Sequence, residues 1–332
     1  SDCLKIHRVK LPSHNSGMFD QSKAFLHFSK ETVNLTKNTD YDLVYATSSR
    51  LMTAALGALV ARKKQAKLYL DIRDIFVDTV GDVLPPIIAT IAKPTFSLVE
   101  RWAFSRADKI NLVSKGFEGY FKERYPKGEF SWFTNGIDNE FIEASSCVSG
   151  DVEKKGPVKI LYAGNIGEGQ GLHEIIPAMA QLLSGKAVFQ IIGDGGRKAQ
   201  LQDAIKEHKL DNVELLPPIN RNELVEAYKQ ADVLFLHLND YPAFRKVLPS
   251  KLFEYAAMGK PILAGIAGYA EDFVKAEIDN AAVFAPCDAE GAEIALASLN
   301  GSVKPRVEFL QKFSRKKIMR DMAADILNLC PK

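Results

Sequence analysis

Apolar positions in this chain form short continuous runs that alternate with longer stretches at helical spacing. In the second half, Val158–Ala163 and Ala187–Ile192 are largely apolar runs of strand length, and each leads into glycines. Between them, Leu172–Leu183 repeats its apolar residues at helical intervals. Continuous apolar runs separated by helices are typical of parallel strands that are buried on both faces. The pattern therefore predicts an α/β fold with a parallel sheet.

The first half follows a similar pattern, and a polar stretch separates the two halves. Residues 143–157 are rich in serine, glycine and charge, which is typical of a linker. We therefore predict an N-terminal domain over residues 1–142, a second domain over residues 158–308 and a last helical segment over residues 309–330. In the first domain we expect strands at Leu4–Lys10, Asp42–Ala46, Lys67–Ile72, Lys109–Val113 and Phe130–Thr134, with helices notably at Ser49–Ala61 and Ile87–Phe104.

Composition narrows the function classes. The chain has 332 residues, 46% of them hydrophobic and 25% charged, so it is long enough for two ordinary α/β domains. Its net charge of +2 and its lack of a recognition module argue against a nucleic-acid partner. Its four cysteines show no CxxC spacing, which argues against a disulfide framework and a zinc site and suits a reducing cytosol.

Two glycine clusters follow the first two strands of the second domain. Gly164 opens the first cluster, which holds four glycines in eight residues and runs into a helix. The second cluster, Gly193–Gly196, ends the next strand. A strand, a glycine-rich turn and a helix expose backbone N–H groups to an anion, and ligands of open parallel sheets lie beyond the carboxyl ends of the strands. We therefore expect an anionic ligand at this edge.

A short, mostly apolar helix carries the next candidate groups. Ser250 is a suitable N-cap and Gly259-Lys-Pro261 a suitable stop. Lys251 and Glu254 lie three residues apart in its first turn, so they share one face near the positive end of the helix dipole. A cation and a carboxylate there suit a ligand with both phosphates and hydroxyls. The alternative is a surface ion pair on a capped helix.

These segments together resemble glycosyltransferase family 4, the retaining nucleotide-sugar transferases of GT-B fold, and in particular bacterial O-antigen and capsule enzymes. The resemblance covers nearly the whole chain. It rests on the order and spacing of several motifs: Ala107–Ser114, Asn135-Gly-Ile-Asp138, Gly164–Gly171, Ile191–Gly196, Leu215–Ile219, Leu224–Leu236 and Pro249–Glu254. It implies two Rossmann-like domains facing across a cleft, with the last helix crossing back to the first domain.

The resemblance also implies a role for each donor-site residue. Gly164, Asn165 and Gly167 would lie at the phosphates and the donor sugar, and Ile219 would lie at the nucleobase. Glu254 matches the glutamate that binds the ribose hydroxyls in the family. The implied donor is a nucleotide-diphosphate sugar, most simply a UDP-sugar. No metal or other cofactor is implied, because cationic side chains and helix dipoles stabilise the leaving diphosphate in this family.

The donor loop departs from the family pattern at its charged positions. Many members have an arginine after the first glycine and a lysine before the last, whereas this chain has Asn165 and Gln170. Lys246 stands where the family places a first glutamate. We expect Arg245, Lys246 and Lys251 to supply the positive charge at the diphosphate, or, alternatively, the Arg245–Lys246 pair to be a solvated basic pair.

The first domain departs from the family as well. The family's opening segment, with its first strand and a glycine-rich loop, has no counterpart before Leu4, so we expect this domain to lack its first strand-helix units. Where members often place a histidine beside the reacting sugar, this chain has Arg73-Asp74. We predict that this pair acts at the sugar, the alternative being a local salt bridge. The carboxylates Asp71, Asp74, Asp78 and Asp82 are interpreted as loop and acceptor contacts rather than metal ligands.

The resemblance finally implies a lipid-linked or other glycan acceptor and a cytoplasmic enzyme. The apolar stretch Val83–Phe104 predicts either an interfacial helix at the inner face of the cytoplasmic membrane or a helix packed on the sheet. Two other functions stay open from the sequence. One is a non-hydrolysing UDP-sugar epimerase of GT-B fold, and the other is a non-catalytic nucleotide-binding or assembly protein.

Overall fold

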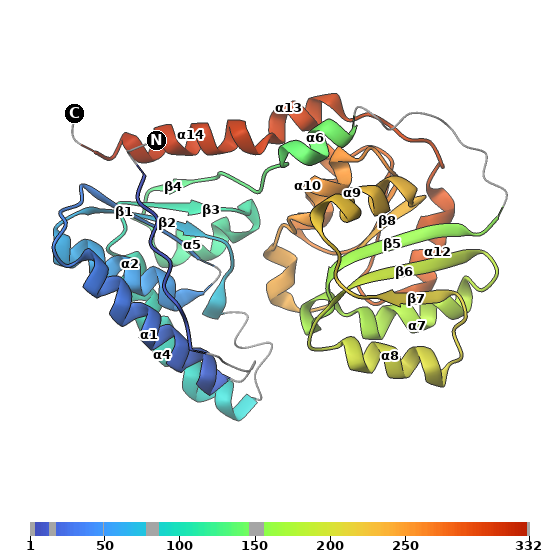
Figure 1. Ribbon diagram of the computed structural model, residues 1–332, viewed down its shortest axis with the longest axis horizontal. Coiled ribbons are helices and arrows are strands. Elements are labelled where there is room, and N and C mark those ends of the chain that lie inside the picture. The colour runs from blue at the N-terminus through green and yellow to red at the C-terminus, as the bar shows by residue number, and fades with distance from the viewer. Residues whose placement is uncertain (1–3, 13–17, 49, 78–85, 146–155, 331–332) are drawn as a thin grey trace. The chain divides into compact units, whose positions relative to one another are not determined.

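The computed structural model describes residues 4–12, 18–48, 50–77, 86–145 and 156–330. The chain divides into two compact units. The first comprises residues 1–111, 124–131 and 325–332, and the second comprises residues 112–123 and 132–324. Each unit contains one parallel sheet with helices packed on it, so the predicted α/β class with two parallel sheets is confirmed (Figure 1).

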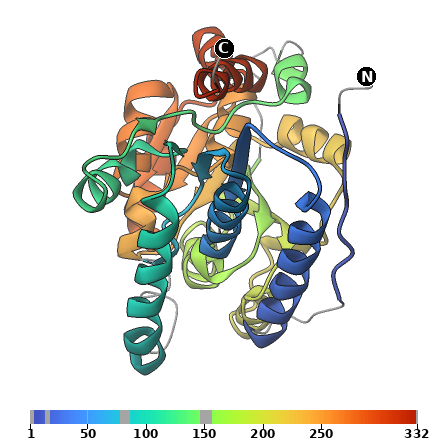
Figure 2. The ribbon, with the colours of Figure 1, turned by 90° about the vertical axis from the view of Figure 1, so that its left-hand side faces the viewer.

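The first unit has a four-stranded sheet in the order β1-β2-β3-β4. Helix α2 packs against β1 and β2, and helix α4 packs against α2, so α1, α2 and α4 stand in a row with α2 in the middle (Figure 2). Gly57 allows α2 to approach the sheet, because a Cβ added there would lie 2.7 Å from the Cβ of Ala46. The bounds are α1 Met18–Thr36, β1 Leu43–Ser48, α2 Leu51–Lys64, β2 Lys67–Ile72, α4 Pro86–Phe104, β3 Lys109–Leu112 and β4 Phe130–Ser131.

The predicted strand at Leu4–Lys10 is wrong. Residues 4–12 form no helix or strand, and the side chains of Leu4 and Ile6 are 73% and 68% exposed. An alternating pattern becomes a strand only where a neighbouring strand offers its edge for hydrogen bonds, and no described strand pairs with this segment.

The second unit has a six-stranded sheet in the order β10-β9-β8-β5-β6-β7. Alternate strand residues face two separate cores: Leu161 and Leu234 belong to one, and Ile160 and Phe235 to the other. Figure 1 shows α9 and α10 on one side of this sheet and α7 and α8 on the other. The strands are β5 Val158–Asn165, β6 Ala187–Asp194, β7 Val213–Leu216, β8 Val233–His237, β9 Ile262–Gly265 and β10 Ala281–Phe284.

The connections of the second unit place helices or 3₁₀ turns after each strand. Those before and between the first strands are η1 Lys115–Phe117, α5 Glu118–Arg124, α6 Asn139–Ser145, η2 Glu168–Gln170, α7 Leu172–Leu182 and α8 Lys198–Glu207. Those that follow are α9 Arg221–Gln230, η3 Pro242–Lys246, α10 Lys251–Ala257, α11 Tyr269–Glu277, α12 Ala289–Ser298, α13 Val307–Phe313 and α14 Arg315–Leu327. Helix α6 extends to Ser145, so its last three residues overlap the predicted linker. Most of the predicted linker lies outside the described residues.

The last segment is two helices rather than the single one predicted. Helix α13 ends and α14 begins on either side of Ser314, which forms a parallel bridge to Ile137. Asp138 of the Asn-Gly-Ile-Asp motif accepts hydrogen bonds from Arg221 and Arg315. This motif therefore fixes the helix break through backbone pairing and ion pairs.

Among the described helices, none is both long enough and apolar enough to cross a membrane. Helix α4 covers most of the stretch for which either an interfacial helix or a packed helix was predicted. Several side chains in its first half are not described by the structure.

Candidate functional site

The glycine-rich loop after β5 adopts a backbone that only glycine tolerates at its key positions. Gly164 and Gly193 are register partners at the ends of β5 and β6, with φ of 148° and 156°. A Cβ added at Gly193 would lie 1.8 Å from the carbonyl oxygen of Gly164. The two strand ends can therefore approach each other because Gly193 lacks a side chain.

Lys251, the first residue of α10, reaches into this loop. A Cβ added at Gly164 would lie 2.0 Å from Nζ of Lys251, so the ammonium occupies the space that a side chain would fill. The ring of Tyr162 lies 5.7 Å from the same nitrogen. Burial lowers the pKa of Lys251 below its usual value of 10.5. Among the described residues none accepts a hydrogen bond from this ammonium, and the nearby Glu254 carboxylate acts on it only through space.

Glu254 lies one turn further along α10 and is half-buried. Its carboxylate accepts a hydrogen bond of 3.2 Å from the Tyr228 hydroxyl. Burial raises the pKa of Glu254, and Lys251 opposes that shift. The alternative of a surface ion pair is wrong for these two residues, because both are partly buried and no ion pair joins them.

The predicted N-cap at Ser250 forms differently from the expectation. Ser250 has helical backbone angles, φ −61° and ψ −29°, and its side chain accepts no capping hydrogen bond. The helix therefore begins on a preceding turn, and the first N–H groups of α10 gain no serine acceptor.

Asn165 and Gln170, which replace the family's loop cations, are bonded to each other. The Asn165 amide donates to Oε1 of Gln170 at 2.7 Å, and the Gly167 N–H donates to the same oxygen at 3.3 Å. A neutral amide pair thus closes the loop, where two cations would repel each other. The structure brings Gly164, Asn165, Gly167 and Lys251 together, and their assignment to the donor stays a prediction.

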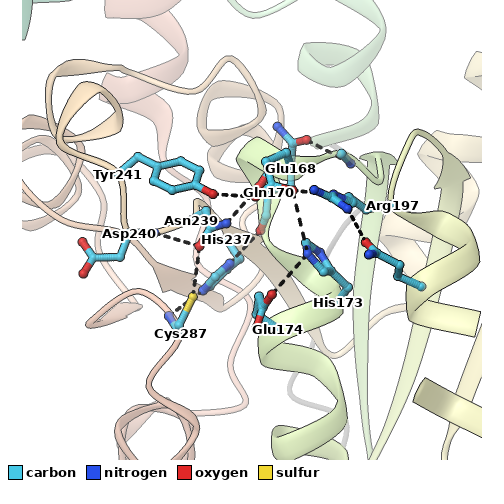
Figure 3. A network of polar contacts seen from close by, with 12 residues as sticks. Glu168, Gln170, His173, Glu174, Arg197, His237, Asn239, Asp240, Tyr241 and Cys287 are labelled. Atoms are coloured by element: carbon cyan, nitrogen blue, oxygen red, sulfur yellow. Dashed lines mark hydrogen bonds and ion pairs between the residues drawn. The ribbon is translucent and has the colours of Figure 1, made fainter. Parts of the chain in front are cut away.

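The segment after β8 anchors the loop from the opposite side (Figure 3). Nδ1 of His237 lies 2.7 Å from the carbonyl oxygen of Gln170. Asn239 donates from its side chain to the Glu168 carbonyl at 3.1 Å and from its backbone to the Gly169 carbonyl at 2.9 Å. Three consecutive carbonyls of the loop are therefore fixed by two residues of one strand end.

Glu168 is the acidic member of the loop, and it is held by two elements. Its carboxylate accepts a 2.5 Å hydrogen bond from the Tyr241 hydroxyl. It also forms an ion pair with Arg197 at the start of α8 (Figure 3). These partners lower the pKa of Glu168, the Tyr241 hydrogen bond most of all. The Arg197 cation is consequently committed to Glu168.

The other predicted donor-site residues lie on neighbouring segments. Arg245 is exposed and forms an ion pair of 3.2 Å with Asp240. Lys246 extends over the ring of Tyr120, 5.5 Å from its centre. Ile219 is half-buried after β7 and packs against one core. Their assignment to the diphosphate and the nucleobase stays a prediction.

In the first unit, Asp71 is built into a polar network. Asp71 is 3% exposed at the carboxyl end of β2, and it accepts hydrogen bonds from Tyr45, Thr47 and Asn111 at 3.0, 2.7 and 2.8 Å. The neighbouring Asp71 and burial raise the pKa of Tyr45 to about 12, with burial the larger cause.

Arg73 approaches this network from the strand end. Its guanidinium lies 3.6 Å from the Asp71 carboxylate, so the predicted alternative of a local salt bridge is present, but to Asp71. Asp74 is half-buried. The catalytic assignment of Arg73 and Asp74 stays a prediction, and Asp78 and Asp82 lie outside the described residues.

Sequence reasoning did not predict the anchoring residues Asn239, Tyr241 and Arg197, nor the role of Asp71. Asn239 and Tyr241 follow a buried strand at its carboxyl end, and that position was the available signal. Among the described residues there is also no group of three or more side chains able to hold a metal ion.

Comparison with known proteins places these features in context. The family model described as glycosyl transferases group 1 matches residues 150–313. WcaI of Escherichia coli (strain K12), named as a colanic acid biosynthesis glycosyl transferase, is 36% identical over 112 residues. WbjE of Pseudomonas aeruginosa, named as a glycosyltransferase, is 30% identical over 283 residues. The matches cover 34% and 79% of this chain, and 27% and 66% of the two relatives.

Solved structures share the fold at low sequence identity. Sucrose-phosphate synthase from Thermosynechococcus elongatus superposes with a TM-score of 0.74 at 17% identity, covering 97% of this chain and 82% of that one. HepE from Anabaena, solved with UDP and glucose, gives 0.68 at 18% identity, covering 95% and 84%. These likenesses show the fold, two Rossmann-like domains.

Proposed function

We propose that this protein is a glycosyltransferase that uses a nucleotide-diphosphate sugar, because residues 150–313 match the family model described as glycosyl transferases group 1. The donor is a UDP-sugar, and the sugar passes with retention of configuration to a lipid-linked glycan precursor. The product belongs to bacterial surface-polysaccharide assembly, such as O-antigen or capsule. Relatives named for colanic acid biosynthesis and glycosyl transfer, and a similar fold solved with UDP, support this proposal.

The observation that carries the proposal is the Lys251 ammonium at Gly164, which has no hydrogen-bond acceptor in the described part of the chain. A buried cation is costly unless it is paired, so a position that keeps one without an acceptor favours binding of an anion. The carboxyl ends of β5 and β6 and the start of α7 meet at this loop, where backbone dipoles also favour negative charge. The loop and Lys251 together suit the diphosphate of the donor.

The chemistry follows from where charge develops. As the bond between the sugar and the β-phosphate breaks, negative charge grows on the leaving nucleotide diphosphate. Lys251 and the N–H groups of the loop stabilise that charge in a partly desolvated site, so they act more strongly in the transition state than in the ground state. Glu254 accepts a hydrogen bond from Tyr228 at one carboxylate oxygen, and its other oxygen accepts hydrogen bonds from the ribose hydroxyls.

The first unit supplies the acceptor side in this proposal. Arg73 and Asp74 follow β2 at its carboxyl end, where ligands of parallel sheets bind, and they act at the reacting sugar. The reaction needs no metal ion. The enzyme works in the cytoplasm, in peripheral contact with the membrane that carries its acceptor.

The experiment is transfer of radiolabelled sugar from UDP-sugars to a lipid fraction from bacterial membranes. The proposal predicts label in the organic phase that requires the wild-type protein and falls at least tenfold with Lys251→Met. Label that appears only as a UDP-sugar epimer, with no acceptor present, would instead support an epimerase. Nucleotide binding without any turnover would support a non-catalytic protein.

A further inference from the structure

His237, the last residue of β8, is the most enclosed polar side chain of the donor-loop network. It has no exposed surface, and its ring lies beside those of Phe235 and Phe284, each with its centre 6.2 Å away. Gly265 on the adjacent strand makes room for it, because a Cβ there would lie 2.3 Å from Cδ2 of His237. Packing therefore restricts the orientation of the ring.

Both ring nitrogens of His237 have partners that dictate its tautomer. Nδ1 lies 2.7 Å from the Gln170 carbonyl oxygen, which can only accept, so Nδ1 carries the proton. Nε2 lies 2.9 Å from the backbone nitrogen of Cys287, which can only donate, so Nε2 is unprotonated. Burial also lowers the pKa of His237 to about 4, which keeps the ring neutral at physiological pH.

The bond to Gln170 connects His237 to the residues at the predicted phosphate site. The backbone of Gln170 is held by His237, and the side chain of the same residue holds Asn165 and Gly167. Displacing the Gln170 carbonyl would thus move the amide that closes the loop. Figure 3 shows His237 and Gln170 side by side in this network.

We propose that His237 is a positioning residue for donor binding, which holds the glycine-rich loop in its ligand-ready shape by donating from Nδ1 to Gln170. The inference rests on the proposed function, since it assumes that this loop binds the nucleotide diphosphate. Asn239 still anchors Glu168 and Gly169 when His237 is replaced, so the loop loses its shape at Gln170 and keeps its place.

Three variants separate the two bonds of His237. The amide nitrogen of Asn in His237→Asn stands near the position of Nδ1 and can donate to Gln170. The amide oxygen of Gln in His237→Gln reaches the position of Nε2 and can accept from Cys287. His237→Phe keeps an aromatic ring in the stack and loses both bonds. His208→Gln, at an exposed position after α8, is the matched control.

The measurement is the dissociation constant of UDP by calorimetry, with the unfolding midpoint of each variant recorded alongside. We expect His237→Gln and His237→Phe to weaken UDP binding by about fivefold or more, and His237→Asn to stay within about twofold of wild type, as does His208→Gln. UDP binding by His237→Gln as tight as wild type, or by His237→Asn as weak as His237→Phe, would overturn the inference.

A second measurement does not depend on variants that fold. Nitrogen NMR of the ¹⁵N-histidine wild-type protein reports the tautomer directly, and we expect one buried ring protonated at Nδ1 and bare at Nε2 from pH 6 to pH 8. A charged ring or the opposite tautomer would refute the assignment. If wild-type protein binds no UDP at all, the proposed function fails. If wild type binds and the variants bind equally well, only the role of His237 fails.

Discussion

Lys251→Met should change stability and ligand binding in opposite directions. The substitution removes the buried ammonium beside Gly164 and keeps an unbranched apolar side chain of similar length. In the free protein this ammonium has no hydrogen-bond acceptor among the described residues, and burial lowers its pKa, so its charge opposes folding. In the complex the same charge pairs with a diphosphate.

The magnitudes follow from these two environments. A charge-assisted hydrogen bond to a phosphate contributes about 1.5–3 kcal/mol, so UDP affinity should fall by about 12-fold to 150-fold. Removing a partly buried charge that has no hydrogen-bond acceptor among the described residues should raise the free energy of unfolding by about 0.5–2 kcal/mol, or roughly 1–8 °C in midpoint for a domain of this size.

The pH dependence of the free energy of unfolding tests whether the Lys251 charge destabilises the folded protein. The folded-state pKa of Lys251 lies below the unfolded value of 10.5, so the unfolded chain binds more protons between these two values. The wild type therefore gains stability as pH rises through that window, and the stability advantage of Lys251→Met should shrink toward pH 10.5.

The assay is calorimetric titration with UDP together with thermal unfolding at pH 7 and pH 9.5. Lys251→Arg is the control that keeps a cation but not the compact ammonium geometry. A Lys251→Met protein that is less stable than wild type and binds UDP equally well would refute the reasoning, because Lys251 would then be a structural residue.

Three further predictions test neighbouring features. Glu254→Ala should weaken nucleotide binding by about 1–3 kcal/mol. Because burial raises the pKa of Glu254, the affinity of the wild type should also fall as the pH drops through that raised pKa. Calorimetry with UDP measures both effects, and unchanged affinity would contradict the ribose assignment. Gly193→Ala should lower the free energy of unfolding by more than about 2 kcal/mol in urea titration, because the added Cβ would lie 1.8 Å from the Gly164 carbonyl oxygen. Gly196→Ala is the control and should change this free energy by less than about 0.5 kcal/mol, because nothing lies within 4 Å of its added Cβ. Equal losses would contradict the strand-end geometry. Asp71→Ala should destabilise the first unit by about 2–4 kcal/mol, because it leaves buried hydrogen-bond donors unpaired. Asp71→Asn should destabilise it less. An unfolding midpoint of Asp71→Asn at or below that of Asp71→Ala would contradict this prediction.

The sequence predicted the second unit well because its strands are continuous apolar runs. The observed β5 and β6 begin at the predicted residues Val158 and Ala187, and the glycine clusters mark their ends. Such signals are local, and each residue carries its own information on burial and turn geometry.

Other features could not be predicted because they depend on contacts between distant segments. The bond between His237 and Gln170 spans 67 residues, and no periodic pattern marks it. Ser314 interrupts the last helix because Ile137 pairs with it, although the helix pattern of residues 309–329 is continuous. Leu4–Lys10 alternates like a strand, but no described strand edge receives it.

The donor loop shows which features the sequence reveals and which ones need the structure. From the sequence, Asn165 and Gln170 are two separate departures from a family pattern. In the structure they form one hydrogen-bonded pair, and Lys251 places a cation at Gly164. A side-chain pair of this kind is visible only when both partners are placed.

The most direct test of a nucleotide-diphosphate donor site is thermal unfolding of the wild-type protein with UDP and, in parallel, with uridine. A ligand at about 100 times its dissociation constant adds about 2.7 kcal/mol, enough to raise the midpoint by several degrees. The account predicts a clear rise with UDP and little with uridine at the same concentration, because the diphosphate meets Lys251 and the glycine-rich loop. Equal shifts with both ligands, or no shift with UDP, would contradict it.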